Sequence, residues 1–322
     1  LYHQLQDKFD RKCINNVISQ VRERIKNLLE NENEYIKTEV YFKPKKLAEG
    51  KLEFRPLHTT DLITQIAIVS MLHLFIYEIP TNDNSQLRLS NLSRLIPSDF
   101  YGNRISVKPE YLFKPWKKQY QKYNQNSNDA LKKYHTSLEY KYEVTLDLKN
   151  FFPTINPLVI YYYIIEHLPA HLTEADMKLM KTVLRKLLFC KLNKEFDEKM
   201  EAQYYKISPE DKENNASVEK EEKDKSQNLS ENECESTKER LKSCEFVRGI
   251  PQGLPQSYFL GNIYMIFVSE IFRNKFKGRS YFYVDDSVIF TNDVQEDEEQ
   301  FKNQLLDING QIKKEAEKIL QP

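Results

Sequence analysis

The stretch FYVDDSVIF, residues 282–290, sets two neighbouring carboxylates, Asp285 and Asp286, inside a segment that is otherwise almost wholly apolar and aromatic. A buried unpaired carboxylate is costly, and a second like charge beside it increases the cost. The longer stretch 279–291 predicts two short strands joined at this acid pair. Asp is a common turn residue, so a plain hairpin turn is the simpler interpretation, but the apolar flanks favour a site that binds positive charge.

A second acid, Asp147, closes the apolar and β-branched stretch YEVTLDL, residues 142–148, which alternates as a strand does. If this strand and the hairpin are neighbours in one sheet, Asp147, Asp285 and Asp286 converge at one edge. Three carboxylates without His or Cys form an oxygen-only set, which suits Mg²⁺ or Mn²⁺ and not zinc. Two such ions, about 3.5–4 Å apart, are the usual arrangement for phosphoryl transfer to a 3′ hydroxyl.

Helical patterns surround these strands. Apolar residues recur at helical spacing over 15–35 and 296–320, and Pro157 opens a further helical stretch over 157–168. The stretches 59–79 and 255–276 are apolar on most sides, which indicates buried helices. The order of strand, helix, helix, hairpin and helix predicts an α+β fold with an antiparallel sheet.

The charge of the chain is balanced but uneven, with 48 basic and 48 acidic residues in total. Residues 191–243 hold 11 basic and 15 acidic side chains, which leaves 37 and 33 elsewhere. The remainder is mildly basic, which permits nucleic-acid binding without establishing it. Within the acidic stretch, 208–240 is polar and nearly free of aromatic residues, so we expect a flexible insertion that interrupts one domain.

Basic and aromatic residues are interleaved in FKPWKKQYQKY, residues 113–123. Such a pattern can follow a nucleic-acid backbone. A solvated amphipathic helix explains it equally well.

No run of about 18 apolar residues predicts a membrane helix, and no signal peptide is recognised at the start of the chain. The cysteines Cys13, Cys190, Cys234 and Cys244 lack the spacing of a zinc site and are expected as reduced thiols. These features predict a cytoplasmic protein without a membrane partner.

Five blocks of the sequence resemble the reverse transcriptases, specifically the bacterial lineage of group II introns, retrons and abortive-infection proteins. YVDD at 283–286 is similar to their catalytic hairpin, and LDLKNFFPTI at 146–155 to the strand that carries the other metal ligand. RGIPQGLPQSYFLGNIYM at 248–265 resembles the loop and helix under the nascent base pair. GKLEFRPL at 50–57 and SDFYGNRIS at 98–106 resemble segments of the fingers. Each block alone is a weak match, but the five stand in the family's order.

The resemblance implies roles for the residues that match. Asp147, Asp285 and Asp286 are the expected catalytic carboxylates and the ligands of two Mg²⁺ or Mn²⁺ ions. Phe152, five residues after Asp147, matches the bulky residue that crowds the sugar 2′ position and favours deoxynucleotides. A core position is the plainer interpretation of Phe152.

Further residues are expected to bind the nucleotide by the same resemblance. Gln252 and Gly253 match the PQG that lines the nucleotide pocket, where a missing side chain lets the backbone approach closely. Arg55 matches a fingers residue that clamps the triphosphate, assisted by Lys46 or by its neighbour Lys45. Arg suits this role because its planar fork binds phosphate bidentately. A surface ion pair is the plainer interpretation of Arg55.

The architecture implied by the resemblance is the palm and fingers of a right-hand polymerase, with a thumb that is short or missing. Fingers and the start of the palm are expected over 1–145, and the first catalytic strand and helix of the palm over 146–190. The insertion follows over 191–243, and the palm resumes over 244–293 with the nucleotide-pocket loop, its helix and the hairpin. The palm end or the start of the thumb is expected over 294–322.

The implied activity is that of an RNA-directed DNA polymerase, a nucleotidyltransferase that adds deoxynucleoside triphosphates to an RNA or DNA template-primer. Homo-oligomerisation is compatible with this reading. The sequence lacks the VTG of retrons and a maturase segment, and its blocks are most similar to abortive-infection and other phage-defence reverse transcriptases. Two alternatives remain: template-independent or protein-primed DNA synthesis by the same site, and an inert palm that serves as an RNA-binding or assembly scaffold.

Overall fold

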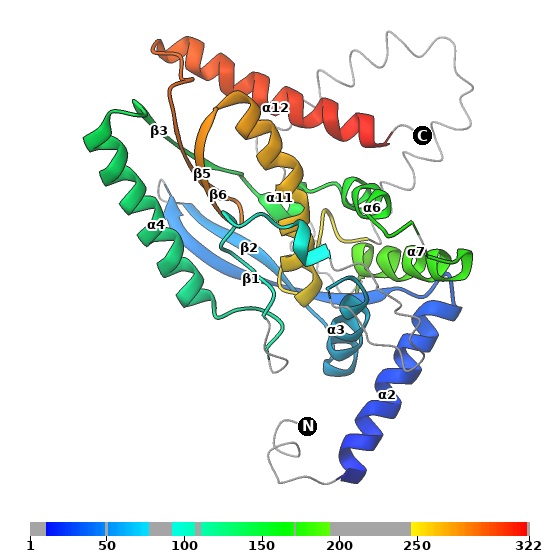
Figure 1. The fold of residues 1–322 in the computed structure, drawn as a ribbon. Coiled ribbons are helices and arrows are strands. Elements are labelled where there is room, and N and C mark those ends of the chain that lie inside the picture. Colours follow the sequence, from blue (N-terminus) through cyan, green and yellow to red (C-terminus); the bar gives the residue numbers. More distant parts are fainter. Residues whose placement is uncertain are drawn as a thin grey trace.

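The structure, a computed structural model, describes residues 11–48, 51–76, 92–106, 111–170, 172–193 and 246–320 (Figure 1). Within these ranges the side chains of 11–12, 45–48 and 51–53 are not described. The predicted insertion at 208–240 lies outside the described residues. Helices and two small sheets make up the described part, so the predicted α+β fold is confirmed.

A three-stranded antiparallel sheet carries both groups of acids. Its strands, in spatial order, are β3 (Tyr142–Asp147), β6 (Asp286–Thr291) and β5 (Gly278–Tyr283). The predicted hairpin and the predicted pairing with the 142–148 strand are both confirmed. The turn differs by one residue from the prediction, because it consists of Val284 and Asp285, and Asp286 already belongs to β6.

Helices pack around this sheet and against one another. Their bounds are α2 (Arg11–Glu30), α3 (Leu62–Ile76), η1 (Leu92–Leu95), α4 (Trp116–Ser137), α5 (Phe151–Thr154), α6 (Pro157–Glu166), α7 (Glu174–Leu188), α11 (Pro255–Lys275) and α12 (Glu298–Leu320). The five helices predicted from the sequence are confirmed as α2, α3, α6, α11 and α12. Among the described residues, no helix is long and apolar enough to cross a membrane.

Helix α7 was not predicted, although its start is visible in the sequence. The Thr173 hydroxyl accepts a hydrogen bond from the Asp176 backbone N–H, and the Asp176 carboxylate accepts one from the Thr173 backbone N–H. This reciprocal capping box satisfies two backbone donors that a helix start otherwise leaves unpaired.

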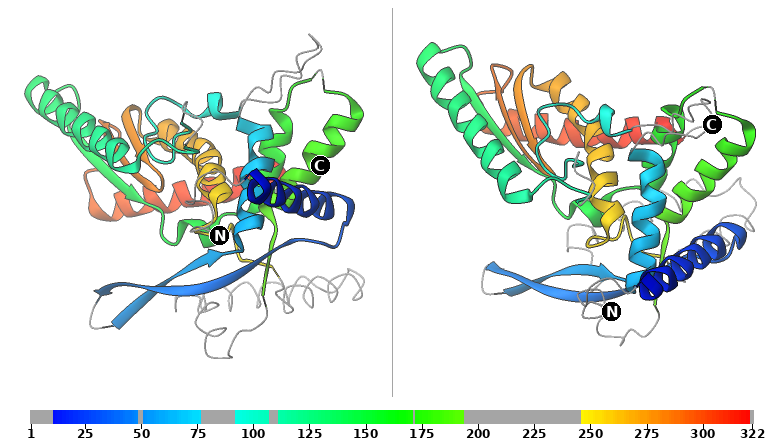
Figure 2. Two further views of the ribbon diagram at one scale, coloured as in Figure 1. Left: turned by 90° about the horizontal axis from the view of Figure 1, so that it is seen from below. Right: turned by 60° about the horizontal axis from the view of Figure 1, so that its bottom comes forward.

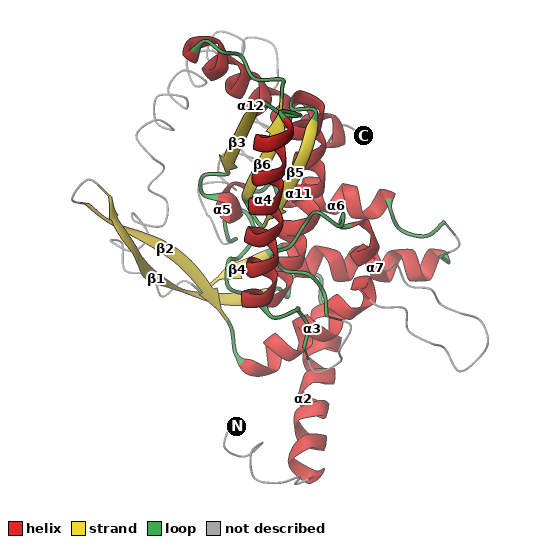
Figure 3. Cartoon of the chain, turned by 60° about the vertical axis from the view of Figure 1, so that its left-hand side comes forward, coloured by secondary structure: helices red, strands yellow, loops and turns green. Residues whose placement is uncertain are grey.

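The two faces of the antiparallel sheet are covered by different helices (Figure 3). Because successive strand residues point to opposite faces, Phe282 and Ile289 enter the main hydrophobic core, which also contains apolar residues of α6, α11 and α12. Tyr281 and Phe290 point the other way and pack in a second, smaller cluster with the buried residues of α4. The sheet is therefore enclosed on both sides, with α4 alone packed on the second face among the described helices.

A second sheet is built mainly from a long hairpin. Strands β1 (Ile36–Ala48) and β2 (Lys51–Thr59) are antiparallel, and β4 (Cys190–Leu192) pairs in parallel with the start of β1. Figure 2 shows the far end of this hairpin extending away from the helices. Residues 51–57 of the block at 50–57 belong to β2, which brings Arg55 opposite the acids of the first sheet.

The described residues on either side of 194–245 lie next to each other. Lys191 and Phe246 form an antiparallel bridge, and the Val247 backbone N–H donates to the Cys190 carbonyl at 2.8 Å. The Asn193 N–H donates to a carbonyl of β1. Residues 194–245 thus connect two neighbouring points on the same sheet edge.

Candidate active site

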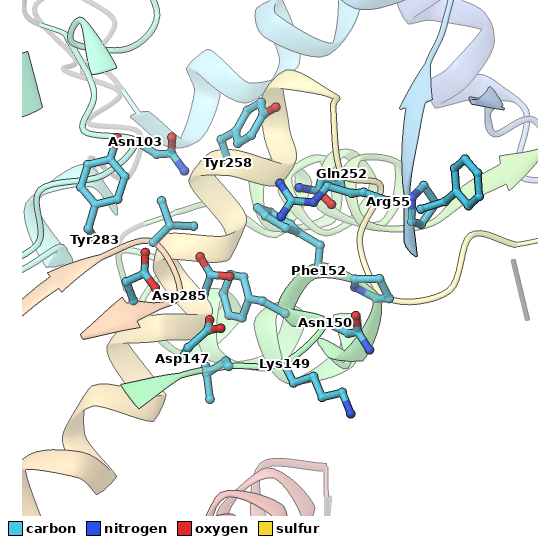
Figure 4. A pocket seen from close by; sticks show the side chains of 17 residues that line it. Arg55, Asn103, Asp147, Lys149, Asn150, Phe152, Gln252, Tyr258, Tyr283 and Asp285 are labelled. Atoms are coloured by element: carbon cyan, nitrogen blue, oxygen red, sulfur yellow. The ribbon is translucent and has the colours of Figure 1, made fainter. Parts of the chain in front are cut away.

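A pocket of about 490 Å³ lies between the ends of the antiparallel sheet and β2 (Figure 4). Seventeen residues line it. Those predicted from the sequence are Arg55, Asp147, Phe152, Gln252, Asp285 and Asp286. Residues that are distributed over four blocks of the sequence therefore meet in one pocket.

The strand register fixes the relation of the acids. Asp147 and Asp286 are Cα partners across β3 and β6, and Asp286 is also the partner of Tyr283 across β6 and β5. Directly paired residues point to the same face of a sheet. These three side chains therefore form a row at the sheet end, and Asp285 lies beside them in the turn that joins β5 to β6.

The turn that carries Asp285 has an unusual backbone. Val284 adopts a φ of 58°, and a positive φ is strained for a β-branched residue. A positive φ at the first turn position alone is the sign pattern of a type II′ turn, which suits the twist of a two-residue hairpin.

The block at 98–106 holds this turn in place. The Tyr101 N–H donates to the Phe282 carbonyl, and the Phe282 N–H donates to the Asp99 carbonyl, each at 2.9 Å. A Cβ on Gly102 would lie 2.6 Å from Val284 Cγ2, so only glycine fits there without a shift. The turn is therefore clamped from outside, which lets the structure hold a strained residue beside the acids.

Burial and mutual repulsion make the ionised form of the acids unfavourable. Burial, together with the neighbouring charges of Asp286 and Asp147, raises the pKa of Asp285 to about 6, while Arg55 acts against them. Burial, followed by the charge of Asp147, also raises the pKa of Asp286. Negative charge is thus disfavoured at this sheet end unless positive charge is added.

Arg55 and Gln252 lie across the pocket from the acids (Figure 4). The loop that carries Gln252 is joined to β2, because the His58 N–H donates to the Gln252 carbonyl at 2.7 Å. His58 is buried, and desolvation lowers its pKa to about 4, so it is neutral at pH 7. The neutral imidazole of His58 therefore supports the contact between the Gln252 loop and β2 without adding charge near Arg55.

Gly253 is required by this joint. It adopts a φ of 116°, and a Cβ at this position would lie 2.5 Å from the His58 carbonyl oxygen. Gly253 itself does not line the pocket. The missing side chain allows a close backbone approach, as expected, but the approaching group is the protein's own β2.

Phe152 lines the pocket and is also part of the core. Its ring is 6% exposed and stands edge-on to the rings of Phe151 and Tyr258, with centroids at 5.2 and 6.1 Å. The two interpretations of this residue are therefore compatible, since one edge of a core ring can form a pocket wall.

Lys45 and Lys46 belong to β1, but their side chains lie outside the described part of the structure.

Sequence reasoning missed several polar and aromatic residues that also line the pocket, although each stands in one of the five blocks. They are Asn103, Lys149, Asn150, Tyr258 and Tyr283.

The donor set fits a divalent cation that shares its ligands with a substrate. Among the described residues, no group of three or more His, Cys, Asp or Glu side chains could hold a metal ion by itself. Mg²⁺ usually takes only one or two carboxylates from the protein and completes its shell with water and substrate phosphates. Asp147, Asp285 and Asp286 supply such carboxylates in the same pocket.

No protein-family model and no curated protein sequence matches this chain. The pocket and the resemblance of the five blocks are therefore what point to a function.

Proposed function

We propose that this protein is a metal-dependent DNA polymerase of the reverse-transcriptase type, which adds deoxynucleotides to a 3′ hydroxyl. One observation carries the proposal: the cross-strand pair Asp147 and Asp286 shares a pocket with Asp285 and with Arg55 on the far wall. Carboxylates on one side and a guanidinium on the other match the needs of phosphoryl transfer from a triphosphate.

In this proposal the β3-β6-β5 sheet with its helices is the palm, and the β1-β2 hairpin belongs to the fingers. Asp147, Asp285 and Asp286 would hold the divalent ions. When bound, Mg²⁺ or Mn²⁺ lowers the pKa of the attacking hydroxyl and neutralises the departing pyrophosphate. Arg55 holds the phosphates, Gln252 contacts the nucleotide, and Phe152 limits the space beside the sugar 2′ position.

The five-block resemblance extends the proposal to substrate and setting. The substrates are deoxynucleoside triphosphates and an RNA or DNA template-primer, and the setting is phage defence in the cytoplasm. The pocket supports the proposed substrate class, because it combines the Arg55 guanidinium with three carboxylates in one space.

Nucleotide incorporation by the purified chain tests the proposal. The protein is incubated with Mg²⁺ and deoxynucleotides on a labelled primer, with an RNA template, a DNA template or no template, and the product is sequenced. Asp285→Asn serves as the inactive control. Template-dependent extension that is lost in this variant supports the proposal.

Other outcomes separate the alternatives. Product of random or homopolymeric sequence without template indicates template-independent synthesis. Product that remains covalently attached to the protein indicates protein priming. RNA binding without incorporation under every condition overturns the polymerase and leaves the inert scaffold.

A further inference from the structure

Helix α4 carries a concentration of positive charge in a chain whose net charge is zero. Residues 111–137 contain six Lys and a single Asp, with no Arg or Glu. The helix packs on the sheet through Tyr123, Ala130 and Tyr134, which are buried. The remaining faces of the helix, which carry its lysines, are exposed.

A row of aromatic rings leads from the pocket onto this helix. Tyr283 lines the pocket, and Tyr120 stands edge-on to it with ring centroids 5.1 Å apart. Trp116 lies one helical turn before Tyr120. Tyr120 is 43% exposed and Trp116 is 65% exposed, so neither ring is needed to fill the core.

Lysines are interleaved with these rings. Lys117, Lys118 and Lys122 are exposed on the first two turns of α4. The Lys117 ammonium lies 5.8 Å from the centre of the Trp116 ring. Exposed rings for base stacking, with cations beside them for phosphates, are the two components of surfaces that bind single-stranded nucleic acid.

We propose that Trp116, Lys117, Lys118, Tyr120 and Lys122, called here the α4 platform, bind a single-stranded stretch of RNA or DNA next to the pocket. The inference deepens the proposed polymerase function and rests on it for the meaning of the bound strand. A single strand is favoured over a duplex because its bases offer free faces for stacking, whereas neighbouring base pairs cover those faces in a duplex.

Intrinsic fluorescence reports directly on the α4 platform, because Trp116 is the one tryptophan of the chain. The full chain is titrated in EDTA, without nucleotides, with a 20-nucleotide single-stranded RNA, the same sequence as DNA, and a blunt DNA duplex. Stacking of a base on Trp116 is expected to quench its emission with either single strand and much less with the duplex. Preference for RNA or for DNA then identifies the source of the strand.

Variants test whether the named side chains carry the binding. With labelled single strands, Trp116→Ala is expected to raise Kd on the order of 5- to 100-fold, the range for loss of one stacking ring. Lys117→Gln with Lys118→Gln should lower the slope of log K against log salt by about 1.4, since each phosphate contact contributes about 0.7 for single strands. The matched control is Lys313→Gln with Lys314→Gln, exposed lysines on α12, which should change neither quantity.

The binding assay is independent of catalysis. In the Asp285→Asn variant, single strands should still quench the Trp116 emission. A failure of the polymerase assay is therefore distinguishable from a failure of strand binding at the α4 platform. Absence of quenching with both single strands, in protein shown to be folded by circular dichroism, overturns the inference. Equal quenching by the duplex, or an equal loss of affinity in the α12 control, overturns it as well.

Discussion

Asp147 and Asp286 face each other directly across two antiparallel strands, one of which precedes the charged stretch at 191–243 and the other of which follows it. The Cα atoms of such partners are about 4.5–5.5 Å apart. Backbone hydrogen bonds, and not side-chain contacts, therefore set the spacing of these carboxylates. A shift of the register by one residue would turn one of them to the opposite face.

Asp285→Asn is expected to abolish nucleotide incorporation, with a loss of roughly a hundredfold or more, because a neutral amide is a poor ligand for a hard cation. The variant should nevertheless fold. Primer extension with Mg²⁺ measures the loss, and circular dichroism checks the fold. Full activity in this variant would remove the basis of the proposed function.

The same substitution should change how stability depends on pH. The pKa of Asp285 is about 6 in the folded protein against an ordinary value of 3.8, so ionisation destabilises the fold as the pH rises from about 4 to 6. In EDTA, the variant should therefore have the higher Tm above pH 6, and the two proteins should converge near pH 4. A Tm difference that is the same at every pH would contradict this assignment.

Arg55→Gln should weaken nucleotide binding and shift the acid limb of the pH profile. The positive charge of Arg55 lowers the pKa of Asp285, so its removal should raise that pKa and move the onset of kcat/KM to higher pH. KM for the deoxynucleotide should rise about tenfold, since a charge-assisted contact is lost. Lys313→Gln, at an exposed lysine of α12 that does not line the pocket, is the control and should leave both quantities unchanged.

Phe152→Ala should admit ribonucleotides. The ring lines the pocket, and in the proposed function it fills the space of a 2′ hydroxyl, so the ratio of kcat/KM for deoxynucleotide over ribonucleotide should fall about tenfold or more. Phe152→Leu should give an intermediate ratio. Because the ring is also in the core, Phe152→Ala should cost about 3–5 kcal/mol of stability.

A core variant away from the pocket separates the effect on sugar preference from the effect on stability. Phe259→Leu removes a buried ring of α11 that does not line the pocket, so stability should fall while the sugar preference stays constant. If Phe152→Ala remains active with an unchanged ratio, Phe152 serves only the core.

Gly253→Ala should destabilise the protein by about 1–3 kcal/mol, because the new Cβ meets the His58 carbonyl and the backbone has a positive φ. Urea denaturation measures the change. Gly310→Ala is a control of opposite sign: it lies within α12, no atom lies within 4 Å of the new Cβ, and helix propensity predicts a gain of about 0.5–1 kcal/mol. If Gly253→Ala is as stable as the wild type, the contact between the Gln252 loop and β2 can rearrange around the new Cβ without a measurable loss of stability.

Replacement of 208–240 by a short Gly/Ser linker is expected to leave Tm within about 2 °C of the wild type. The chain enters and leaves the described part at neighbouring points, so a short connection can close the gap between them. Differential scanning calorimetry checks the expectation. A large fall in Tm would show that the stretch packs on the domain, and loss of activity at constant Tm would assign it a role in binding.

Much of the sheet was predictable because its signals are local and strong. Alternating β-branched residues before Asp147, and apolar runs on both sides of the acid pair, specify strands by themselves. The position of the turn was less predictable. Asp is a common turn residue, so the pattern favoured the two acids as the turn, whereas the structure places strained Val284 there and supports it with Gly102.

Features that depend on distant contacts could not be predicted. Strand β4 has three residues, too few for a period to be recognised, and its parallel pairing with β1 is a tertiary property. The need for glycine at position 253 could not be predicted either, since nothing in the sequence shows that His58 lies against it. The packing of α4 on the sheet was also not foreseen, because its basic and aromatic residues fitted two interpretations.

Lys191 and Phe246 are bridged to each other. A break in the chain between them would therefore leave two fragments that still pair at this bridge. Asp147 would belong to the first fragment, and Asp285 and Asp286 to the second. Neither fragment alone would contain a complete set of acids, and β3 would have to find β6 again before the set re-formed. The protein is therefore suited to split complementation, in which two co-expressed fragments would regain the proposed nucleotide incorporation only when they reassociate.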